Sequence, residues 1–214
     1  MRTGGGARTT LLVIAKEPLP GRVKTRLVPP YTFEQAAMLA AAALSDTLAA
    51  ALAAPACRRV LVLEGRAGPW LPDGFEVIPQ GGGGLDERLA AAFAAVRGPA
   101  LLIGMDTPQV APELLAVEWD GVDAWFGPAV DGGFWALGLR APDPDLVRGV
   151  PVSRPDTGAA QLRRLREAGL RVAELPLLRD VDTAEDAAAV AALAPGTRFA
   201  ACVGRIAAAH GGRP

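Results

Sequence analysis

Four cations crowd into one short segment near the start of the chain, next to residues that break regular structure. The cations are Lys16, Arg22, Lys24 and Arg26, and the breakers among them are Pro18, Pro20 and Gly21. Cationic side chains and flexible backbone on one loop can bind the oxygens of a phosphate. The segment therefore predicts a site for a polyphosphate, and a solvated basic turn is the alternative interpretation.

Two aspartates are candidates for holding a metal ion near that anion. Asp106 follows the apolar segment 100–105, and Asp182 stands immediately before Thr183, which would cap a helix. A hard cation such as Mg²⁺ is commonly bound by one or two carboxylates together with oxygens of a substrate phosphate. We therefore expect Asp106 and Asp182 to face one pocket and to bind Mg²⁺ or Mn²⁺. For Asp182 the alternative is a structural effect on the positive end of the helix.

The scarcity of histidine and cysteine argues against several classes of enzyme. His210 is the one histidine and lies in the tail, and Cys57 and Cys202 match no metal-binding or redox spacing. These facts disfavour a Ser-His-Asp hydrolase, a His-ligated zinc enzyme and a histidine proton shuttle. Attack on a phosphate by a phosphate or carboxylate needs no such base, because a metal and cations supply the electrostatic stabilisation.

The glycine-rich segments do not match the common nucleotide-binding patterns. Residues 21–25 lack the spacing of a P-loop, and residues 81–84 lack its lysine. No Gly-x-Gly-x-x-Gly follows the first predicted strand, which makes a nicotinamide-binding Rossmann domain improbable. The turn Asp131-Gly132-Gly133 is either a plain hairpin turn or a substrate contact.

Apolar segments alternate with helical patterns along the chain. Strands are predicted at residues 11–14, 59–64, 74–78, 100–105, 122–127, 134–139 and 171–175, and helices at 33–54, 85–93, 157–168 and 184–194, with a helical stretch after 197. Strands without polar alternation, separated by helices, are typical of α/β proteins with parallel sheets. Because the cation-rich loop and Asp106 each follow a strand, both should lie at the carboxyl edge, where such sheets bind ligands.

Length and composition favour one domain. Among 214 residues we expect a single domain over 9–209, with flexible tails at 1–8 and 210–214. The net charge of -1 argues against a nucleic-acid partner. No apolar stretch reaches about 18 residues without a charge, and residues 1–8 lack a signal-peptide core, so we expect no membrane partner and a cytoplasmic location. The oligomeric state is left open between monomer and homodimer.

Four blocks of sequence resemble the signatures of an uncharacterised bacterial family labelled glycosyltransferase-A-like. They are residues 15–27, 104–108, 127–134 and 180–186. More distantly, residues 24–27 and 180–183 resemble phospholactate guanylyltransferase, and the general plan is similar to the molybdenum-cofactor guanylyltransferase. The resemblance implies a three-layer α/β/α sandwich with a mostly parallel mixed sheet, the glycosyltransferase-A-like fold.

The resemblance also implies a role for each matched residue. Lys24, Arg26 and Asp106 would act in catalysis, and Asp106 and Asp182 would bind the metal. The nucleotide would contact Ala15, Lys16, Gly21, Arg22, Lys24, Gly81, Gly82 and Gly83, and the acceptor would lie toward Asp131, Gly132 and Ser153. In residues 80–88 an acid and a glycine are exchanged relative to the family pattern, so GTP is only slightly favoured. In residues 152–154 a valine replaces an aromatic and an arginine is added, so the acceptor cannot be transferred.

The expected activity is a metal-dependent nucleotidyl transfer. A nucleoside monophosphate would pass from a nucleoside triphosphate to a small phosphorylated or carboxylated acceptor, and pyrophosphate would be released. One alternative is a glycosyltransferase with a nucleotide-sugar donor, although the Asp-x-Asp usual there is replaced by Asp106-Thr107-Pro108. Another alternative is a nucleotide-binding regulatory protein without turnover.

Overall fold

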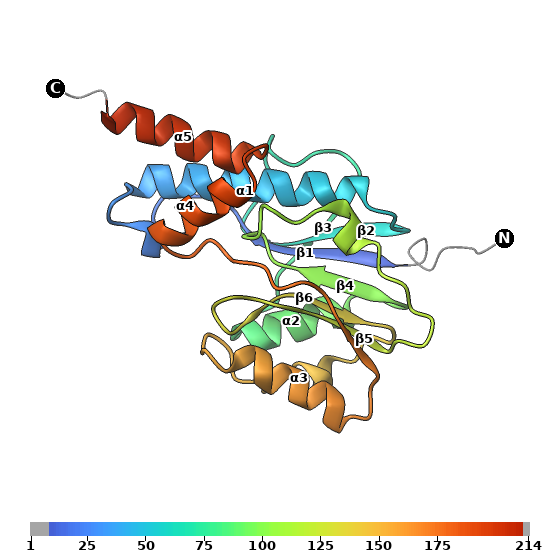
Figure 1. The fold of residues 1–214 in the computed structure, drawn as a ribbon. Helices are drawn as coiled ribbons and strands as arrows, with labels where there is room; N and C mark the ends of the chain where they lie inside the picture. Colours follow the sequence, from blue (N-terminus) through green and yellow to red (C-terminus); the bar gives the residue numbers. More distant parts are fainter. Residues whose placement is uncertain (1–8, 212–214) are drawn as a thin grey trace.

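The computed structural model describes residues 9–211. The expected tail at 1–8 and residues 212–214 of the expected tail at 210–214 lie outside the described residues. A seven-stranded mixed sheet forms the centre of the molecule, in the order β3-β2-β1-β4-β6-β5-β7 (Figure 1). The strands are β1 (Thr10–Lys16), β2 (Arg58–Glu64), β3 (Glu76–Pro79), β4 (Ala100–Ile103), β5 (Ala124–Pro128), β6 (Phe134–Leu139) and β7 (Val172–Glu174). Strand β6 runs antiparallel to β4 and β5, and the other pairs are parallel. The predicted mostly parallel mixed sheet is confirmed.

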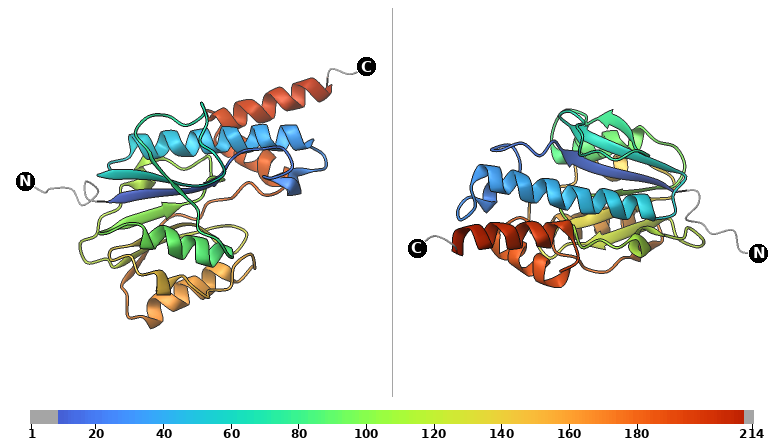
Figure 2. Two further views of the ribbon diagram at one scale, coloured as in Figure 1. Left: turned by 180° about the vertical axis from the view of Figure 1, so that it is seen from behind. Right: turned by 90° about the horizontal axis from the view of Figure 1, so that it is seen from above.

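Helices cover both faces of the sheet, which gives three layers (Figures 1 and 2). They are α1 (Phe33–Ala53), α2 (Leu85–Ala94), α3 (Thr157–Glu167), α4 (Ala184–Leu193) and α5 (Arg198–Gly211), with short 3₁₀ turns η2 (Thr25–Leu27), η3 (Pro112–Leu115) and η4 (Pro144–Leu146). Side chains alternate across each strand, so Leu11 packs toward Leu48 of α1 while Leu12 packs toward Phe93 of α2. This two-sided burial explains why the strands read as continuous apolar runs.

Helices α4 and α5 pack along the side of α1. Val190 of α4 and Phe199 of α5 are buried against Leu39 and Ala43 of α1 (Figure 2). The α5 helix begins where the carboxylate of Asp46, on α1, accepts hydrogen bonds from the backbone N–H groups of Arg198 at 3.1 Å and Phe199 at 2.8 Å. A side chain from a neighbouring helix therefore satisfies two of the donors that a helix start leaves free.

Helix α1 is long and apolar because it is buried on two sides. A capping box begins the helix, since Thr32 Oγ1 accepts from Gln35 N–H and Gln35 Oε1 accepts from Thr32 N–H. By length and composition alone the helix could also cross a bilayer, but 56% of its most apolar window is buried inside the molecule. That burial, between the sheet and α5, is the pattern of a core helix.

Element boundaries differ from the sequence prediction by one to two residues at several strands. The third strand begins at Glu76 and the fifth at Ala124, two residues later than expected in each case. A glycine precedes each start, and Gly74 and Gly121 have positive φ values of 98° and 71°. Glycine allows this backbone at little cost, so the chain is still turning where the hydrophobic pattern has already begun. At the other end, α5 is helical through Gly211, beyond the expected domain limit of 209.

Candidate active site

A cleft of about 740 Å³ opens at the carboxyl ends of β1 and β4, on the side of the molecule where α4 lies. The predicted residues that line it are Ala15, Lys16, Arg22, Lys24, Arg26, Asp106, Asp131, Ser153 and Asp182. Gly21, Gly81, Gly82, Gly83 and Gly132 are not among the lining residues of this cleft, and their ligand contacts stay predictions. The size suits a nucleotide, because pockets for ligands of drug size have about 300–1,000 Å³.

Lys24 lies between the two predicted metal ligands. Its Nζ donates to Asp106 Oδ2 at 2.7 Å and to Asp182 Oδ1 at 2.9 Å. The lysine side chain is 11% exposed, whereas the two carboxylates are 31% and 34% exposed. Asp106 and Asp182 lie 82 and 158 positions after Lys24 in the sequence. The fold has therefore brought the cationic loop and both acids to one point, which the strand-end argument predicts for the loop and Asp106.

The backbone of the cationic loop turns sharply at Lys24. This residue has a φ of 48°, in the left-handed region, and its carbonyl accepts from the N–H of Leu27 at 3.0 Å as η2 begins. Leu27 is fully buried against α1 and α4 residues, which anchors the loop. The fixed backbone therefore aims the lysine side chain inward, toward the ends of β1 and β4.

The two acidic loops are tied to each other by the backbone. The N–H of Val181 donates to the carbonyl of Asp106 at 3.0 Å. Beyond it, Asp186 and Thr183 form a reciprocal capping box at the start of α4, and Arg179 pairs with Asp186 at 2.8 Å. Asp182 therefore lies at the start of α4, as the structural interpretation expects, and its carboxylate also faces Lys24. Its role as a metal ligand stays a prediction.

The pKa values of Lys24 and Asp180 are both raised, for different reasons. Burial alone would lower the pKa of Lys24, but attraction to Asp106 and then to Asp182 outweighs it and raises that pKa above its ordinary value. Burial, followed by repulsion from Asp106 and Asp131, raises the pKa of Asp180 to about 8. Lys24 is therefore a cation at neutral pH, while burial shifts the Asp180 carboxyl toward its protonated form.

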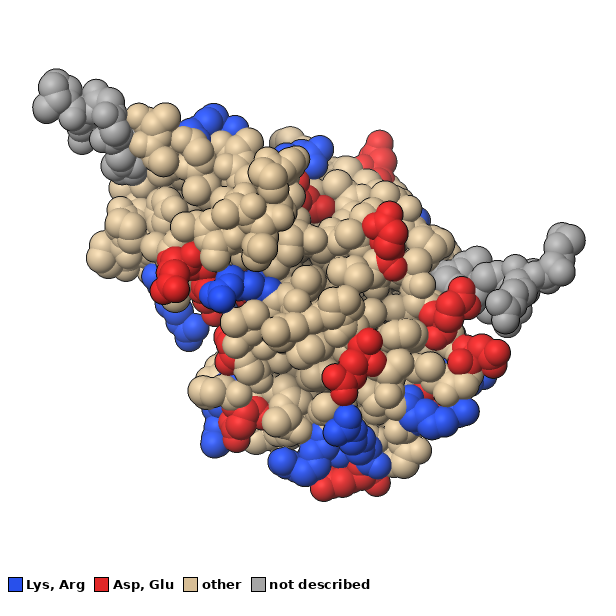
Figure 3. All heavy atoms as spheres, in the orientation of Figure 1, with Lys and Arg blue, Asp and Glu red and all other residues tan. Residues whose placement is uncertain are grey.

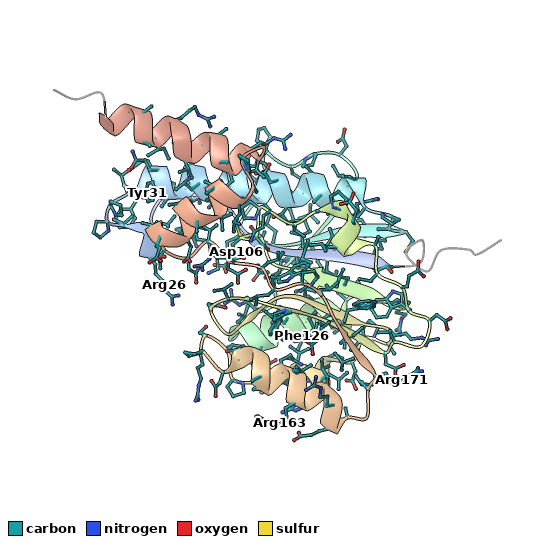
Figure 4. All side chains as sticks on the ribbon, in the orientation of Figure 1. Arg26, Tyr31, Asp106, Phe126, Arg163 and Arg171 are labelled. Atoms are coloured by element: carbon teal, nitrogen blue, oxygen red, sulfur yellow. The ribbon has the colours of Figure 1, made fainter. Side chains whose placement is uncertain are left out.

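The other cations of the loop lie along the rim of the cleft. Arg26 is 74% exposed and its Nη1 lies 3.3 Å from Asp182 Oδ2, while Lys16 pairs with Glu64 at 3.2 Å. Figure 4 shows Asp106 near the central strands and Arg26 farther out, below α4. In Figure 3 acidic and basic side chains adjoin near the start of α4. Arg22 and Arg26 are thus placed at the entrance, where an incoming anion would meet them.

A polar network beside β1 was missed by the sequence analysis. Gln80 Nε2 donates to the carbonyl of Ala15 at 2.6 Å, and Arg88 Nη1 donates to Glu64 Oε2 at 2.9 Å and to Gln80 Oε1 at 3.3 Å. Gln80 and Arg88 both line the cleft. Both residues flank the glycine-rich segment 81–84, which the sequence indicated as part of the site. The expected nucleotide contacts were assigned to the glycines and not to these two side chains.

On the far side of the cleft, the turn after β5 packs tightly against the start of α3. Asp131 Oδ1 accepts from Gly133 N–H at 2.8 Å, and the carbonyl of Gly132 accepts from Gly158 N–H at 2.8 Å. Gly132 has a φ of 86°, and a Cβ there would collide with the carbonyl oxygen of Pro155. This segment is a turn, and Asp131 also lines the cleft together with Ser153, whose φ is 58°.

The acids of the cleft fit a hard divalent cation in one particular mode. Within residues 9–211, no three His, Cys, Asp or Glu side chains form a complete metal cage. Asp106 and Asp182 supply two carboxylates at one point, and among the described residues the buried Oδ1 of Asp180 next to them has no hydrogen-bond partner. Mg²⁺ and Mn²⁺ favour such oxygen donors, and Mg²⁺ commonly completes its shell with substrate phosphate. The residues present fit that mode.

The sequence matches one family model over more than half of its length. Residues 38–154 match the family described as an uncharacterized protein conserved in bacteria (DUF2064). The chain belongs to this family. The matched stretch includes Asp106, Asp131 and Ser153, whereas Lys24 and Asp182 lie outside it. The expected membership of an uncharacterised bacterial family is confirmed, while kinship with the two guanylyltransferases stays a prediction. A comparison with curated proteins gives no significant match.

Several solved structures of other proteins share the fold of this chain. A protein of Desulfovibrio desulfuricans G20, provisionally named a nucleotide-diphospho-sugar transferase, is 28% identical with a TM-score of 0.84, over 94% of this chain and 95% of that one. Rv0371c of Mycobacterium tuberculosis H37Rv, in complex with manganese, is 23% identical with a TM-score of 0.53, over 86% and 97%. The 2-C-methyl-D-erythritol 4-phosphate cytidylyltransferase of Thermus thermophilus is 18% identical with a TM-score of 0.53, over 88% and 99%. The predicted glycosyltransferase-A-like fold is thereby confirmed.

Proposed function

We propose that this protein is a Mg²⁺- or Mn²⁺-dependent nucleotidyltransferase. Its donor would be a nucleoside triphosphate, with GTP slightly favoured, and its acceptor a small phosphorylated or carboxylated molecule. The observation that carries the proposal is the meeting of Lys24 with Asp106 and Asp182 in a large cleft at the strand ends. A cation of the protein beside two potential metal ligands is suited to a polyphosphate that needs both kinds of charge.

In this reaction an oxygen of the acceptor attacks the α-phosphorus of the triphosphate. A new P–O bond forms, the bond between the α-phosphorus and the bridging oxygen breaks, and pyrophosphate leaves with that oxygen. Lys24 would neutralise the charge that develops on the leaving group, with Arg22 and Arg26 at the rim. Asp106 and Asp182 would hold the metal ion, which when bound neutralises and orients the phosphates. No histidine is required, because the acceptor oxygen is already anionic.

The comparisons support a transferase that acts on a nucleotide. The Desulfovibrio protein is named for transfer from a nucleotide-diphospho-sugar, and the Thermus protein is a cytidylyltransferase. The manganese in the Rv0371c structure is in keeping with a divalent metal on this fold. These likenesses argue for a nucleotide in the cleft and do not choose the acceptor.

Glycosyl transfer from a nucleotide sugar is the second candidate, because the name of the 28% identical structure favours it. The same cleft would bind the diphosphate of the donor. The sequence after β4 weighs against it, since Asp106 is followed by Thr107 and Pro108 and so lacks the Asp-x-Asp that glycosyltransferases of this fold usually have. We therefore place nucleotidyl transfer first.

Thermal stabilisation by ligands is the experiment that separates these candidates. The purified protein is heated with Mg²⁺ or Mn²⁺ and each of a panel of nucleoside triphosphates and nucleotide sugars. A triphosphate at about 100 times its Kd should add about 2.7 kcal/mol, which raises the Tm by about 5–11 °C. Stabilisation by a nucleotide sugar alone would favour glycosyl transfer, and no response to either would contradict a nucleotide site.

A matched pair of variants ties that response to the cleft. Asp106→Asn removes one carboxylate beside Lys24 and should abolish the metal-dependent part of the stabilisation. Asp73→Asn removes the same charge at an exposed position outside the cleft lining and should leave it intact. For turnover, pyrophosphate release is measured with candidate acceptors. If Asp106→Asn responds to metal and triphosphate as the unaltered protein does, the role given to Asp106 is wrong.

A further inference from the structure

The ammonium of Lys24 lies where the two carboxylates would present their oxygens to a metal ion. It is 2.7 Å from Asp106 Oδ2 and 2.9 Å from Asp182 Oδ1, and the second oxygen of Asp182 is engaged by Arg26 at 3.3 Å. A Mg²⁺ ion bound by the same two carboxylates would need oxygens at about 2.0–2.1 Å. Lysine and metal therefore compete for the same pair of carboxylates.

Free metal would have to displace a largely buried cation that two carboxylates hold in place. The Lys24 side chain is 11% exposed, and an ammonium that loses its anionic partners while buried is strongly disfavoured. The backbone at Lys24 is fixed by the turn into η2, so only the side chain can move. An arriving triphosphate changes this balance, because its oxygens offer the displaced ammonium a new anionic partner.

We propose that Lys24 makes the cleft selective for a metal–triphosphate complex over the free metal ion. In the absence of the anion, Lys24 occupies the carboxylates and keeps free metal out. When the anion is present, Lys24 turns to the phosphate oxygens and both carboxylates become free for the metal. The exchange of Lys24 from the carboxylates to the phosphate rests on the proposed function. The exclusion of free metal concerns metal binding alone and stands without that function.

The test is calorimetric titration with Mn²⁺ alone, without any nucleotide. Lys24→Met keeps a long apolar stem but removes the charge, so it should bind Mn²⁺ more tightly than the unaltered protein by about tenfold or more. Lys16→Met is the matched control, because it removes the same charge from the cleft lining at a residue paired with Glu64 instead. It should gain less than about threefold, since the Lys16 side chain is 43% exposed and solvent screens its charge. Adding Asp106→Asn to Lys24→Met should remove the gain.

A second titration uses the preformed complex of Mn²⁺ with inorganic tripolyphosphate. Here Lys24→Met should bind more weakly than the unaltered protein, opposite in direction to its gain for Mn²⁺ alone. A variant that had merely lost its structure would bind both Mn²⁺ alone and the Mn²⁺–tripolyphosphate complex more weakly. Circular dichroism checks its fold. If that check fails, Lys24→Arg, which keeps a cation in place, should exclude free Mn²⁺ as lysine does.

Three results would overturn the proposal. These are no gain for free Mn²⁺ in Lys24→Met, an equal gain in Lys16→Met, or tight binding of free Mn²⁺ by the unaltered protein. None of them depends on turnover. Absence of pyrophosphate release alongside the expected titrations would reject nucleotidyl transfer and leave the role of Lys24 standing.

Discussion

Replacing Asp46 by alanine should weaken the attachment of the C-terminal helices. The Asp46 side chain is 8% exposed and accepts the backbone N–H groups of Arg198 and Phe199, at 3.1 and 2.8 Å. Alanine offers no acceptor. The N–H of Phe199 lies in the buried interface and would keep no partner, whereas that of Arg198 is nearer the surface and can turn to water.

The size of the effect follows from these two bonds. A buried donor left unpaired costs about 1–3 kcal/mol, and removal of a capping side chain costs about 0.5–2 kcal/mol. The ion pair of Asp46 with the exposed Arg198 guanidinium, at 3.4 Å, adds little. We expect Asp46→Ala to lower the free energy of unfolding by about 2–3 kcal/mol, which for a chain of this length lowers the Tm by about 4–12 °C.

Urea unfolding followed by circular dichroism measures this change. Asp46→Asn keeps one side-chain oxygen as acceptor and should lose about half as much. Asp73→Ala, at an exposed site, should stay within about 0.5 kcal/mol of the unaltered protein. A loss below about 1 kcal/mol in Asp46→Ala would refute the reasoning, because it would mean that α5 begins without this acceptor.

Three further outcomes are expected. Gly132→Ala should lower the free energy of unfolding by at least about 2 kcal/mol more than Gly149→Ala, because both glycines have positive φ but only the Gly132 position would collide with backbone; equal losses in urea unfolding would contradict this. Asp123 pairs with Arg171, whose hydrogen bonds and charge lower the Asp123 pKa from 3.8 to about 2. That pair therefore stabilises the fold above about pH 4 and loses its effect as the pH falls toward 2; an NMR titration midpoint near the ordinary value would refute it. Asp182→Asn should raise the Kd of the triphosphate in the presence of metal by about tenfold or more, which lowers the thermal stabilisation at a given ligand concentration. An unchanged thermal response would remove Asp182 from the metal site.

The sequence predicted the parts of the site that follow from strand order. The buried runs at residues 11–14 and 100–105 indicated strands of a parallel sheet, and β1 and β4 do pair in parallel. Because parallel strands end at the same edge, the cationic loop and Asp106 were expected there together, and the adjacency of β1 and β4 brings them into contact. The position of Asp182 could also be anticipated, since Thr183 caps α4 as expected.

Contacts between distant residues were out of reach of such reasoning. Lys24 reaches both acids because its backbone is in the left-handed region. Glycine or asparagine at a position predicts such a backbone, whereas lysine does not. The bond from Gln80 to Ala15 spans 65 residues, and the bonds of Asp46 to α5 span 152 and 153. Hydrogen bonds of this kind leave no periodic trace in the sequence, because they are set by how layers of secondary structure pack.

The bond between the Val181 N–H and the Asp106 carbonyl has a consequence for how this site can change over time. It joins two backbones, so the distance between the loops does not depend on which side chains stand at 106 and 182. Any residue except proline at 181 can keep it, because proline has no N–H to donate. Substitution can therefore exchange the chemistry at both positions while the frame that aligns them stays in place.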